Sequence, residues 1–187
     1  QIWESMAQRF YSTNSPGEFV DLKEAVLRSL PADNGLYMPE TIPAVGSDFW
    51  REWRDWSFAE LGYRIVSPLF GGAVPEDTLR EMVAEAVNFD APLVEIGEKM
   101  HVLELFHGPS LAFKDFGARF MARLMAWLTR DDDRELTVLV ATSGDTGGAV
   151  ASAFHRVPGT RVVVLYPSGK VSDLQEKQLT TLGENVV

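Results

Sequence analysis

Residues 136–146, LTVLVATSGDT, decide the fold class of this chain. The first six residues form a β-rich apolar run of the kind that is buried on both faces of a sheet, and a helix of small residues is predicted to follow at 147–156. A second β-branched run at 161–166 and a second amphipathic helix at 172–182 continue the alternation. Strand, helix, strand and helix in this order predict a parallel sheet with right-handed crossovers.

The first half of the chain has a different pattern. Residues 1–97 show helical spacing of apolar residues, interrupted by Pro and Gly at turns. Helices are predicted at 21–30, at 57–70, where Ser57 and Glu60 have the spacing of a capping box, and after Pro75. The third helix has a stripe of apolar residues that predicts its buried face: Leu79, Met82, Val83, Ala86 and Val87. We therefore expect residues 1–97 to form a mostly helical N-terminal region.

The second region, residues 98–187, is predicted to be a parallel α/β region with three αβα layers. A short apolar run at 102–106 and a helix at 113–129 precede the strand–helix alternation. Residues 183–187 predict the end of a helix followed by the first residues of another strand. Because a natural chain seldom stops there, we expect the 187 residues to be a fragment of a longer protein.

The composition excludes several classes of protein. The chain carries 17 Lys and Arg against 27 Asp and Glu, a net charge of −10 that repels phosphate backbones, so nucleic acid is not expected as a partner. Without cysteine, disulfides, Cys-ligated metals and thiol catalysis are excluded, which is compatible with a reducing cytoplasm. No uninterrupted run of about 18 apolar residues exists, so no transmembrane helix and no membrane partner are expected.

One unusual loop, residues 107–117, places Lys114 at or near the start of a helix. The partial positive charge of a helix N-terminus disfavours an ammonium group by a few tenths to about 1 kcal/mol. A lysine that must be neutral to form a Schiff base would benefit from that position. The alternative is a surface lysine beside a capping aspartate, Asp115, and position alone favours this alternative.

A second loop, residues 142–148, follows a predicted strand and precedes a predicted helix. Its glycines let backbone N–H groups converge, and the helix N-terminus adds positive potential, so the loop is a candidate anion site. An ordinary capped turn would have a similar composition.

Other site types find no support in the sequence. No Gly-x-Gly-x-x-Gly follows a predicted strand, and Gly169-Lys170 is followed by Val171, so neither a dinucleotide fingerprint nor a P-loop is present. The histidines, His101, His107 and His155, are scattered, so no metal site is expected.

With both loops in view, the sequence closely resembles the threonine synthase family over nearly its whole length. The blocks that carry the resemblance are residues 10–14 (FYSTN), 33–39 (DNGLYMP), 105–109 (LFHGP), 111–115 (LAFKD), 141–147 (ATSGDTG), 165–167 (LYP) and 169–175 (GKVSDLQ). Two departures are Ser110, where the family commonly has Thr, and Asp173, where it frequently has Pro. The family's Gly-rich cup for the cofactor phosphate lies later in the chain than residue 187.

The resemblance implies a lyase of threonine biosynthesis that depends on pyridoxal 5′-phosphate (PLP) and has the tryptophan-synthase-β fold, fold type II. Its reaction would convert O-phospho-L-homoserine and water to L-threonine and phosphate by β,γ-replacement. Lys114 aligns with the catalytic lysine that forms a Schiff base with PLP. The implied cofactor contacts are Lys114, Phe113, Asp115, Ser143 and Asp145, and the implied substrate contacts are Thr142, Ser143, Gly144, Asp145, Thr146 and Gly147.

Two alternatives stay open. One is a related PLP-dependent phospholyase of the same fold, and the other is a non-catalytic homologous domain. The expected partner is the small-molecule substrate O-phosphohomoserine, the expected location is the cytoplasm, and monomer and homodimer are not distinguished. Since the phosphate cup lies beyond residue 187, the isolated fragment is expected to bind PLP weakly and to be inactive.

Overall fold

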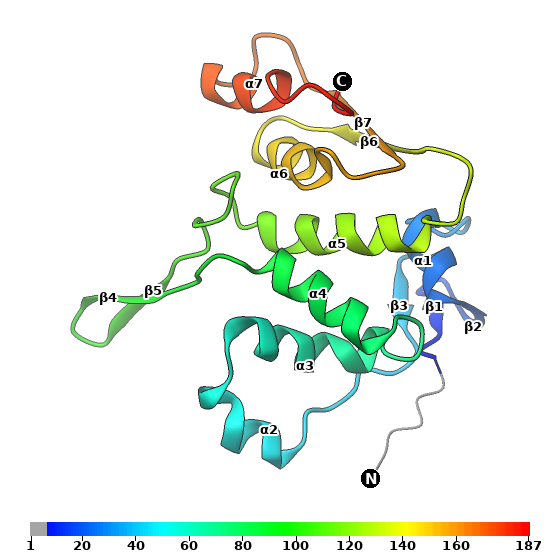
Figure 1. The fold of residues 1–187 in the computed structure, drawn as a ribbon, viewed down its shortest axis with the longest axis vertical. Helices are drawn as coiled ribbons and strands as arrows, with labels where there is room; N and C mark the ends of the chain where they lie inside the picture. The colour runs from blue at the N-terminus through cyan, green and yellow to red at the C-terminus, as the bar shows by residue number, and fades with distance from the viewer. Residues whose placement is uncertain (1–6) are drawn as a thin grey trace. The chain divides into compact units, whose positions relative to one another are not determined.

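The computed structural model describes residues 7–187, and the chain divides after Ala84 into two compact units (Figure 1). The division falls within helix α4 (Glu76–Ala86), whereas the pattern of the sequence changes at residue 97.

The first unit contains a small antiparallel sheet that the sequence analysis did not predict. Its strands are β1 (Phe10–Ser12), β2 (Ser15–Val20) and β3 (Tyr37–Pro39), in the order β2-β1-β3. The expected mostly helical region did not include these strands, because two of them are only three residues long and β2 contains Pro16 and Gly17, which are unfavourable in strands.

Asp33 links the end of β1 to the start of β2 through hydrogen bonds. Its carboxylate accepts hydrogen bonds from the hydroxyls of Ser15 and Ser12, both at 2.7 Å, and from the backbone N–H of Gly35 at 2.9 Å. These bonds, with those from Ser15 and Ser12 the strongest, hold the pKa of Asp33 below its ordinary value. A Cβ at Gly35 would overlap the Ser12 hydroxyl, so the turn needs glycine at this position.

The helices of the first unit are α1 (Leu22–Arg28), α2 (Ser47–Glu52) with a 3₁₀ turn at Trp53–Asp55, α3 (Phe58–Phe70) and α4. Three of them, α1, α3 and α4, agree with the sequence prediction, whereas α2 and the 3₁₀ turn after it were not predicted. Ser57 caps α3 by accepting the Glu60 N–H at 3.1 Å, as predicted. On α4, the predicted apolar stripe is buried at Leu79, Met82, Val83 and Ala86.

The second unit is built around two parallel strands, β6 (Leu136–Ala141) and β7 (Thr160–Leu165). They pair in register from Leu136 opposite Thr160 to Ala141 opposite Leu165. The chain then returns beside β7, where Val186 forms a parallel bridge with Val162. The helices are α5 (Asp115–Leu128), α6 (Asp145–Phe154) and α7 (Asp173–Thr180), so the predicted strand–helix order is confirmed.

The core of this unit lies on one face of the sheet. Alanines of α5 and α6, together with Phe154, pack on Val162, and Val138, Val140 and Val164 join them. On the opposite face Leu139 is 65% exposed and Leu165 is 52% exposed. The expectation that this strand is buried on both faces was therefore wrong for the described residues, which show an α/β unit without a third layer over that face.

Two arginines fix α5 at its place in the unit. The Arg119 guanidinium donates to the carbonyl oxygens of Ala86 and Glu85, at 3.1 and 2.5 Å. Arg123 donates to the Ala153 carbonyl at the end of α6, at 3.1 Å. Burial, with the nearby charge of Arg123, lowers the pKa of Arg119. Because α5 is held to α6 in this way, the segment that begins α5 is held near the segment that begins α6.

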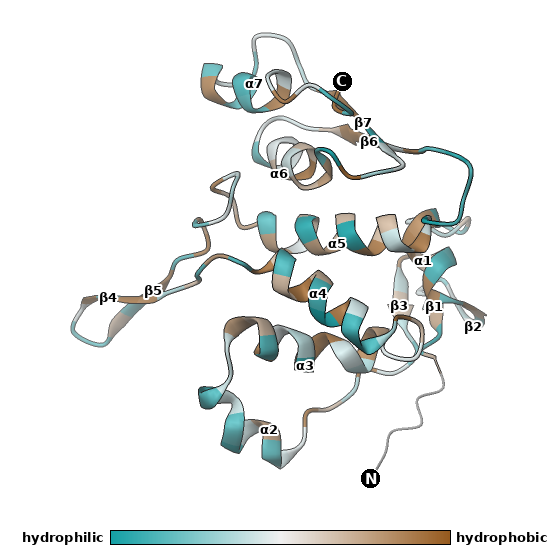
Figure 2. Ribbon diagram, viewed as in Figure 1, coloured by the Kyte–Doolittle hydropathy of each residue, from teal (hydrophilic) through white to brown (hydrophobic). Residues whose placement is uncertain are grey.

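The remaining two strands, β4 (Leu93–Gly97) and β5 (Met100–Leu103), form an antiparallel hairpin. Of the apolar run predicted at 102–106, only Val102 and Leu103 lie in a strand, and they pair with β4 and not with the parallel sheet. Every residue of both strands is exposed, and Figure 2 shows apolar residues along the hairpin.

Candidate active site at the end of β6

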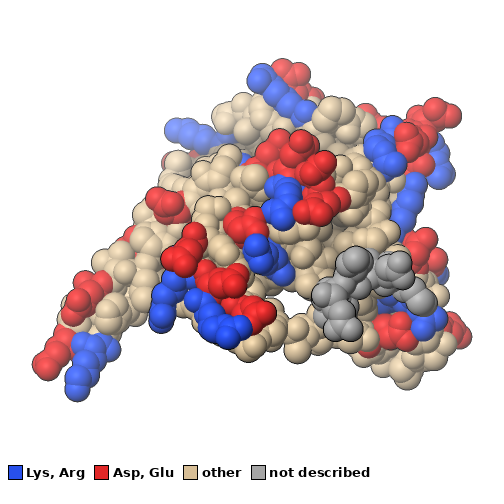
Figure 3. Space-filling view, turned by 60° about the horizontal axis from the view of Figure 1, so that its bottom comes forward, with Lys and Arg blue, Asp and Glu red and all other residues tan. Residues whose placement is uncertain are grey.

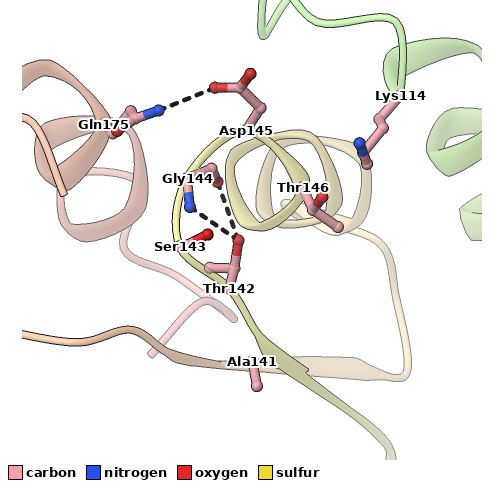
Figure 4. A pocket seen from close by; sticks show the side chains of 8 residues that line it. All are labelled: Lys114, Ala141, Thr142, Ser143, Gly144, Asp145, Thr146 and Gln175. Carbon is pink, nitrogen blue, oxygen red and sulfur yellow. Dashed lines mark hydrogen bonds between the residues drawn. The ribbon is translucent and has the colours of Figure 1, made fainter. Parts of the chain in front are cut away.

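A polar cavity of about 460 Å³ lies where β6 ends and α6 begins (Figure 4). Its position agrees with the rule that ligands bind beyond the carboxyl ends of parallel strands. The residues that line it are Lys114, Ala141, Thr142, Ser143, Gly144, Asp145, Thr146 and Gln175. The structure thus brings together the two loops that the sequence analysis singled out.

The hydroxyl of Thr142 organises the loop from inside. It accepts the backbone N–H groups of Gly144 and Gly147, at 3.1 and 3.0 Å, and donates to the Gly144 carbonyl at 3.2 Å. Gly147 is buried, and a Cβ there would overlap the Thr142 methyl group. Thr142 and Gly147 therefore shape the loop, and their polar groups are used within it.

The first turn of α6 supplies backbone N–H groups to the cavity. Asp145 and Thr146 are its first two residues, so their N–H groups precede the first intrahelical hydrogen bond and point out of the end of the helix. The side chains of Ser143 and Thr146 add hydroxyl groups to the lining. This combination suits a carboxylate or another small anion.

Gln175 is a cavity residue that sequence reasoning missed. Its Nε2 donates to Asp145 Oδ1 at 3.0 Å, and its Oε1 accepts the Ser172 N–H at 3.2 Å. The second bond is half of a capping box at the start of α7, which the sequence Ser172-x-x-Gln175 announces. The pattern predicts the cap. It does not predict that Gln175 Nε2 binds Asp145, which lies 30 positions earlier in the sequence.

Lys114 lies immediately before α5, and its side chain extends toward Thr146 in Figure 4. The residue is exposed and lines the cavity. Within residues 7–187 its amine makes no hydrogen bond or ion pair. The predicted position at the start of a helix is confirmed, and the amine is available to a ligand.

The two residues next to Lys114 in the sequence do not line the polar cavity. Phe113 is 65% exposed and lines a second, apolar hollow of about 270 Å³, which it shares with Lys114, Gly117, Ala118, Met121 and Val150. Asp115 lines neither cavity, because it is 1% exposed and both of its carboxylate oxygens accept hydrogen bonds from Ser110. The implied contact between Asp115 and a cofactor therefore has no support in the geometry.

Comparison with known proteins identifies the group to which this arrangement belongs. Residues 9–87 match the protein family described as the threonine synthase N terminus. Threonine synthase of Haemophilus influenzae is 46% identical over 176 residues, which cover 94% of this chain and 40% of that protein. The Escherichia coli enzyme is 41% identical over 178 residues, covering 95% and 41%.

Solved structures give the same result. The crystal structure of E. coli threonine synthase matches with a TM-score of 0.86 at 41% identity, over 95% of this chain and 41% of that one. PLP-bound threonine synthase from Brucella melitensis matches with a TM-score of 0.90 at 35% identity, over 96% and 40%. This chain matches the N-terminal portion of threonine synthases. It spans about 40% of the length of the relatives that it matches.

The family match and the pairwise matches cover different parts of the chain. The threonine synthase N-terminus match ends at residue 87, before either cavity loop. The relatives and solved structures align over 94–96% of the chain, so the likeness to threonine synthases extends over most of the second unit.

In the described part of the chain, no three His, Asp or Glu side chains gather as a metal site. No helix there has the length and apolar character needed to cross a bilayer. On the face shown in Figure 3, acidic and basic side chains are interspersed.

Proposed function

We propose that these residues form the Lys114 side of the active site of a PLP-dependent threonine synthase. The reaction is the conversion of O-phospho-L-homoserine and water to L-threonine and phosphate. The observation that carries the proposal is the Lys114 amine, which makes no ion pair among the described residues and faces a cavity lined by hydroxyls and helix N-terminal N–H groups. It occurs in a chain that aligns with threonine synthases over 94–96% of its length.

The residues present fit the cofactor. A primary amine is the group that an aldehyde cofactor requires, and Lys114 stands between the polar cavity and the apolar hollow that Phe113 and Met121 line. An aromatic ring suits the apolar hollow, whereas the anionic groups of an amino acid suit the polar cavity. When bound, PLP supplies an electron sink that stabilises negative charge at carbons next to the amino group.

Lys114 would hold the cofactor through its ε-amine and then move protons at the substrate. The β,γ-replacement removes protons from Cα and Cβ and phosphate from Cγ, and it then adds a proton at Cγ, the hydroxyl of water at Cβ and a proton at Cα. An amine tethered at the edge of the cavity has a high effective concentration toward these atoms. Lys114 is the candidate base for Cα and Cβ.

The loop at 142–147 would bind the amino-acid end of the substrate. The N–H groups of Asp145 and Thr146, with the hydroxyls of Ser143 and Thr146, would donate to the substrate carboxylate. Thr142, Gly144 and Gly147 would keep the loop in this shape. The carboxylate of Asp145, which Gln175 orients, suits a cation such as the substrate ammonium group.

For the whole enzyme we propose the three-layer αβα fold of fold type II and a cytoplasmic location. The 187-residue chain alone is expected to bind PLP weakly and to release no phosphate from O-phosphohomoserine. Detection of stoichiometric PLP on Lys114 of this chain after borohydride treatment would contradict that expectation.

The test uses the product of the complete gene, purified with PLP. Threonine and phosphate should form in equal amounts from O-phosphohomoserine, and the visible absorption of the cofactor should change on addition of this substrate. Faster turnover of the one-carbon-shorter O-phosphoserine would favour a related phospholyase. A colourless protein that turns over neither compound would indicate a non-catalytic homologue.

A further inference from the structure

We infer that Asp115 is a positioning residue for Lys114. Its buried carboxylate holds the turn at 108–110 and so fixes the point from which the Lys114 side chain reaches the cavity. This inference rests on the proposed function of Lys114, but it concerns a neighbour that touches neither cavity.

The hydrogen bonds to the Asp115 carboxylate come from the segment before Lys114. Its Oδ1 accepts the Ser110 hydroxyl at 2.7 Å, and its Oδ2 accepts the Ser110 backbone N–H at 2.8 Å. Gly108 lies so close that a Cβ there would overlap the carboxylate. Both oxygens are thus occupied by one residue, and Gly108 closes the remaining space.

The turn between them has a backbone that needs such support. Leu111 has a φ of 58°, in the left-handed region that non-glycine residues rarely adopt. Its N–H donates to the Gly108 carbonyl at 3.0 Å, and the Asp115 N–H donates to Ala112 at 3.0 Å. With Leu111 67% exposed, its own side chain contributes little packing to hold this conformation. The carboxylate of Asp115 is the group that ties the turn to α5.

The charge of Asp115 is well placed for this role. It is the first residue of α5, where the helix dipole stabilises an anion. A carboxylate can accept from both Ser110 donors at once, whereas an asparagine offers one oxygen and one NH₂ group, which would face a second donor. Asp115→Asn therefore keeps the volume of the side chain and removes one of its two bonds.

The experiment measures where PLP attaches. The product of the complete gene is treated with PLP and borohydride, which convert a lysine amine to a stable secondary amine, and peptides are mapped by mass spectrometry. The five lysines of residues 1–187, which are Lys23, Lys99, Lys114, Lys170 and Lys177, provide an internal standard. In the unchanged protein Lys114 should carry most of the adduct.

In Asp115→Asn, the adduct on Lys114 relative to the other four lysines should fall by about tenfold to a hundredfold, as expected for a reacting group displaced by about 1 Å. Asp173→Asn is the matched control, because Asp173 is also the first residue of a helix, α7, and is exposed. This control should leave the distribution unchanged. Thermal unfolding of both variants shows whether the fold is retained.

If Asp115→Asn does not fold, two substitutions at Ser110 provide the test. Ser110→Ala removes the hydroxyl bond and keeps the backbone bond, so the Lys114 share should fall about threefold to tenfold, the range expected for one hydrogen bond. Ser110→Thr keeps a hydroxyl and should restore the share.

The outcomes separate the two proposals. If the unchanged protein shows no preference for Lys114, the proposed function is wrong. If it prefers Lys114 and neither Asp115→Asn nor Ser110→Ala alters that preference, the positioning role of Asp115 is wrong and the proposed function stands.

Discussion

The side-chain amide of Gln175 lies between two helix starts, with Nε2 3.0 Å from Asp145 Oδ1 and Oε1 3.2 Å from the Ser172 N–H. One planar group thus orients a carboxylate at the beginning of α6 and caps α7. Because Asp145 and Gln175 both line the polar cavity, the cap of α7 and the cavity depend on each other.

Gln175→Glu should weaken substrate binding. Glutamate still accepts the Ser172 N–H, since it serves equally well in a capping box. It cannot donate to Asp145, and it places a second negative charge beside that carboxylate. We expect kcat/KM of the complete gene product for O-phosphohomoserine to fall by about tenfold, the value of one hydrogen bond to a charged group. Gln8→Glu, the same change at a partly buried position of the first unit, should have no effect, and equal kinetics for both variants would disprove the role of Gln175.

Lys114→Ala should abolish turnover without unfolding the protein. The side chain is exposed and makes no hydrogen bond or ion pair within residues 7–187, so the free energy of unfolding should change by no more than about 0.5 kcal/mol. Phosphate release and urea unfolding measure the two effects. Lys177→Ala, on the exposed part of α7, serves as the control and should keep full activity. Wild-type turnover by Lys114→Ala would remove the basis of the proposed mechanism.

Two adjacent glycines of α6 should respond in opposite ways to alanine. A Cβ at Gly147 would overlap the Thr142 methyl group, whereas a Cβ at Gly148 meets only Gln178 Oε1, at 3.5 Å. Gly147→Ala should therefore destabilise the protein by about 1–3 kcal/mol, the usual cost of overpacking. Gly148→Ala should stabilise it by about 0.5–1 kcal/mol, because alanine is the better helix former. Urea unfolding of the pair provides the comparison, and equal midpoints would show that the loop at Thr142 yields easily.

The hydrogen bonds to Asp33 predict a pH-dependent contribution to stability. Bonds from Ser15, Ser12 and Gly35 lower the pKa of Asp33 in the folded state, so the contribution is present above the unfolded value of about 3.9 and is lost as pH falls through the lower folded pKa. Asp33→Asn should lower the thermal midpoint at neutral pH, and the difference from the unchanged protein should shrink in acid.

Asp133→Asn, at an exposed carboxylate in the loop before β6, is the control for this series. Its difference from the unchanged protein should stay constant with pH. A constant difference for Asp33→Asn as well would mean that the ionised form of Asp33 is not the form that the sheet requires.

The sequence alone predicted the helices and strands whose signals lie in consecutive residues. Periodicity and caps located α1, α3 and α4, and the apolar run at 136–141 coincides with β6. The sheet formed by β1, β2 and β3 was missed because β1 and β3 are short and because Asp33, which binds the end of β1, lies far from it in the sequence. Likewise, the apolar run at 102–106 gave no sign that β5 would pair with β4.

The same distinction holds for the candidate site. Lys114 and the loop at 142–147 were found because a helix start and a glycine-rich turn are visible in consecutive residues. The resemblance implies a cofactor contact for Asp115, and this contact stays a prediction. The direction of its carboxylate, which points back to Ser110, could not be predicted from the sequence. Gln175 was missed because its bond to Asp145 joins two different strand–helix units.

The bond between Ser110 and Asp115 closes a loop of very few residues, and such closures form quickly and at low entropic cost during folding. We therefore expect the backbone around the Lys114 amine to take its final shape early, from contacts with neighbouring residues. Mutations that slow the assembly of the parallel sheet would then delay the appearance of the pocket while leaving this short segment already arranged.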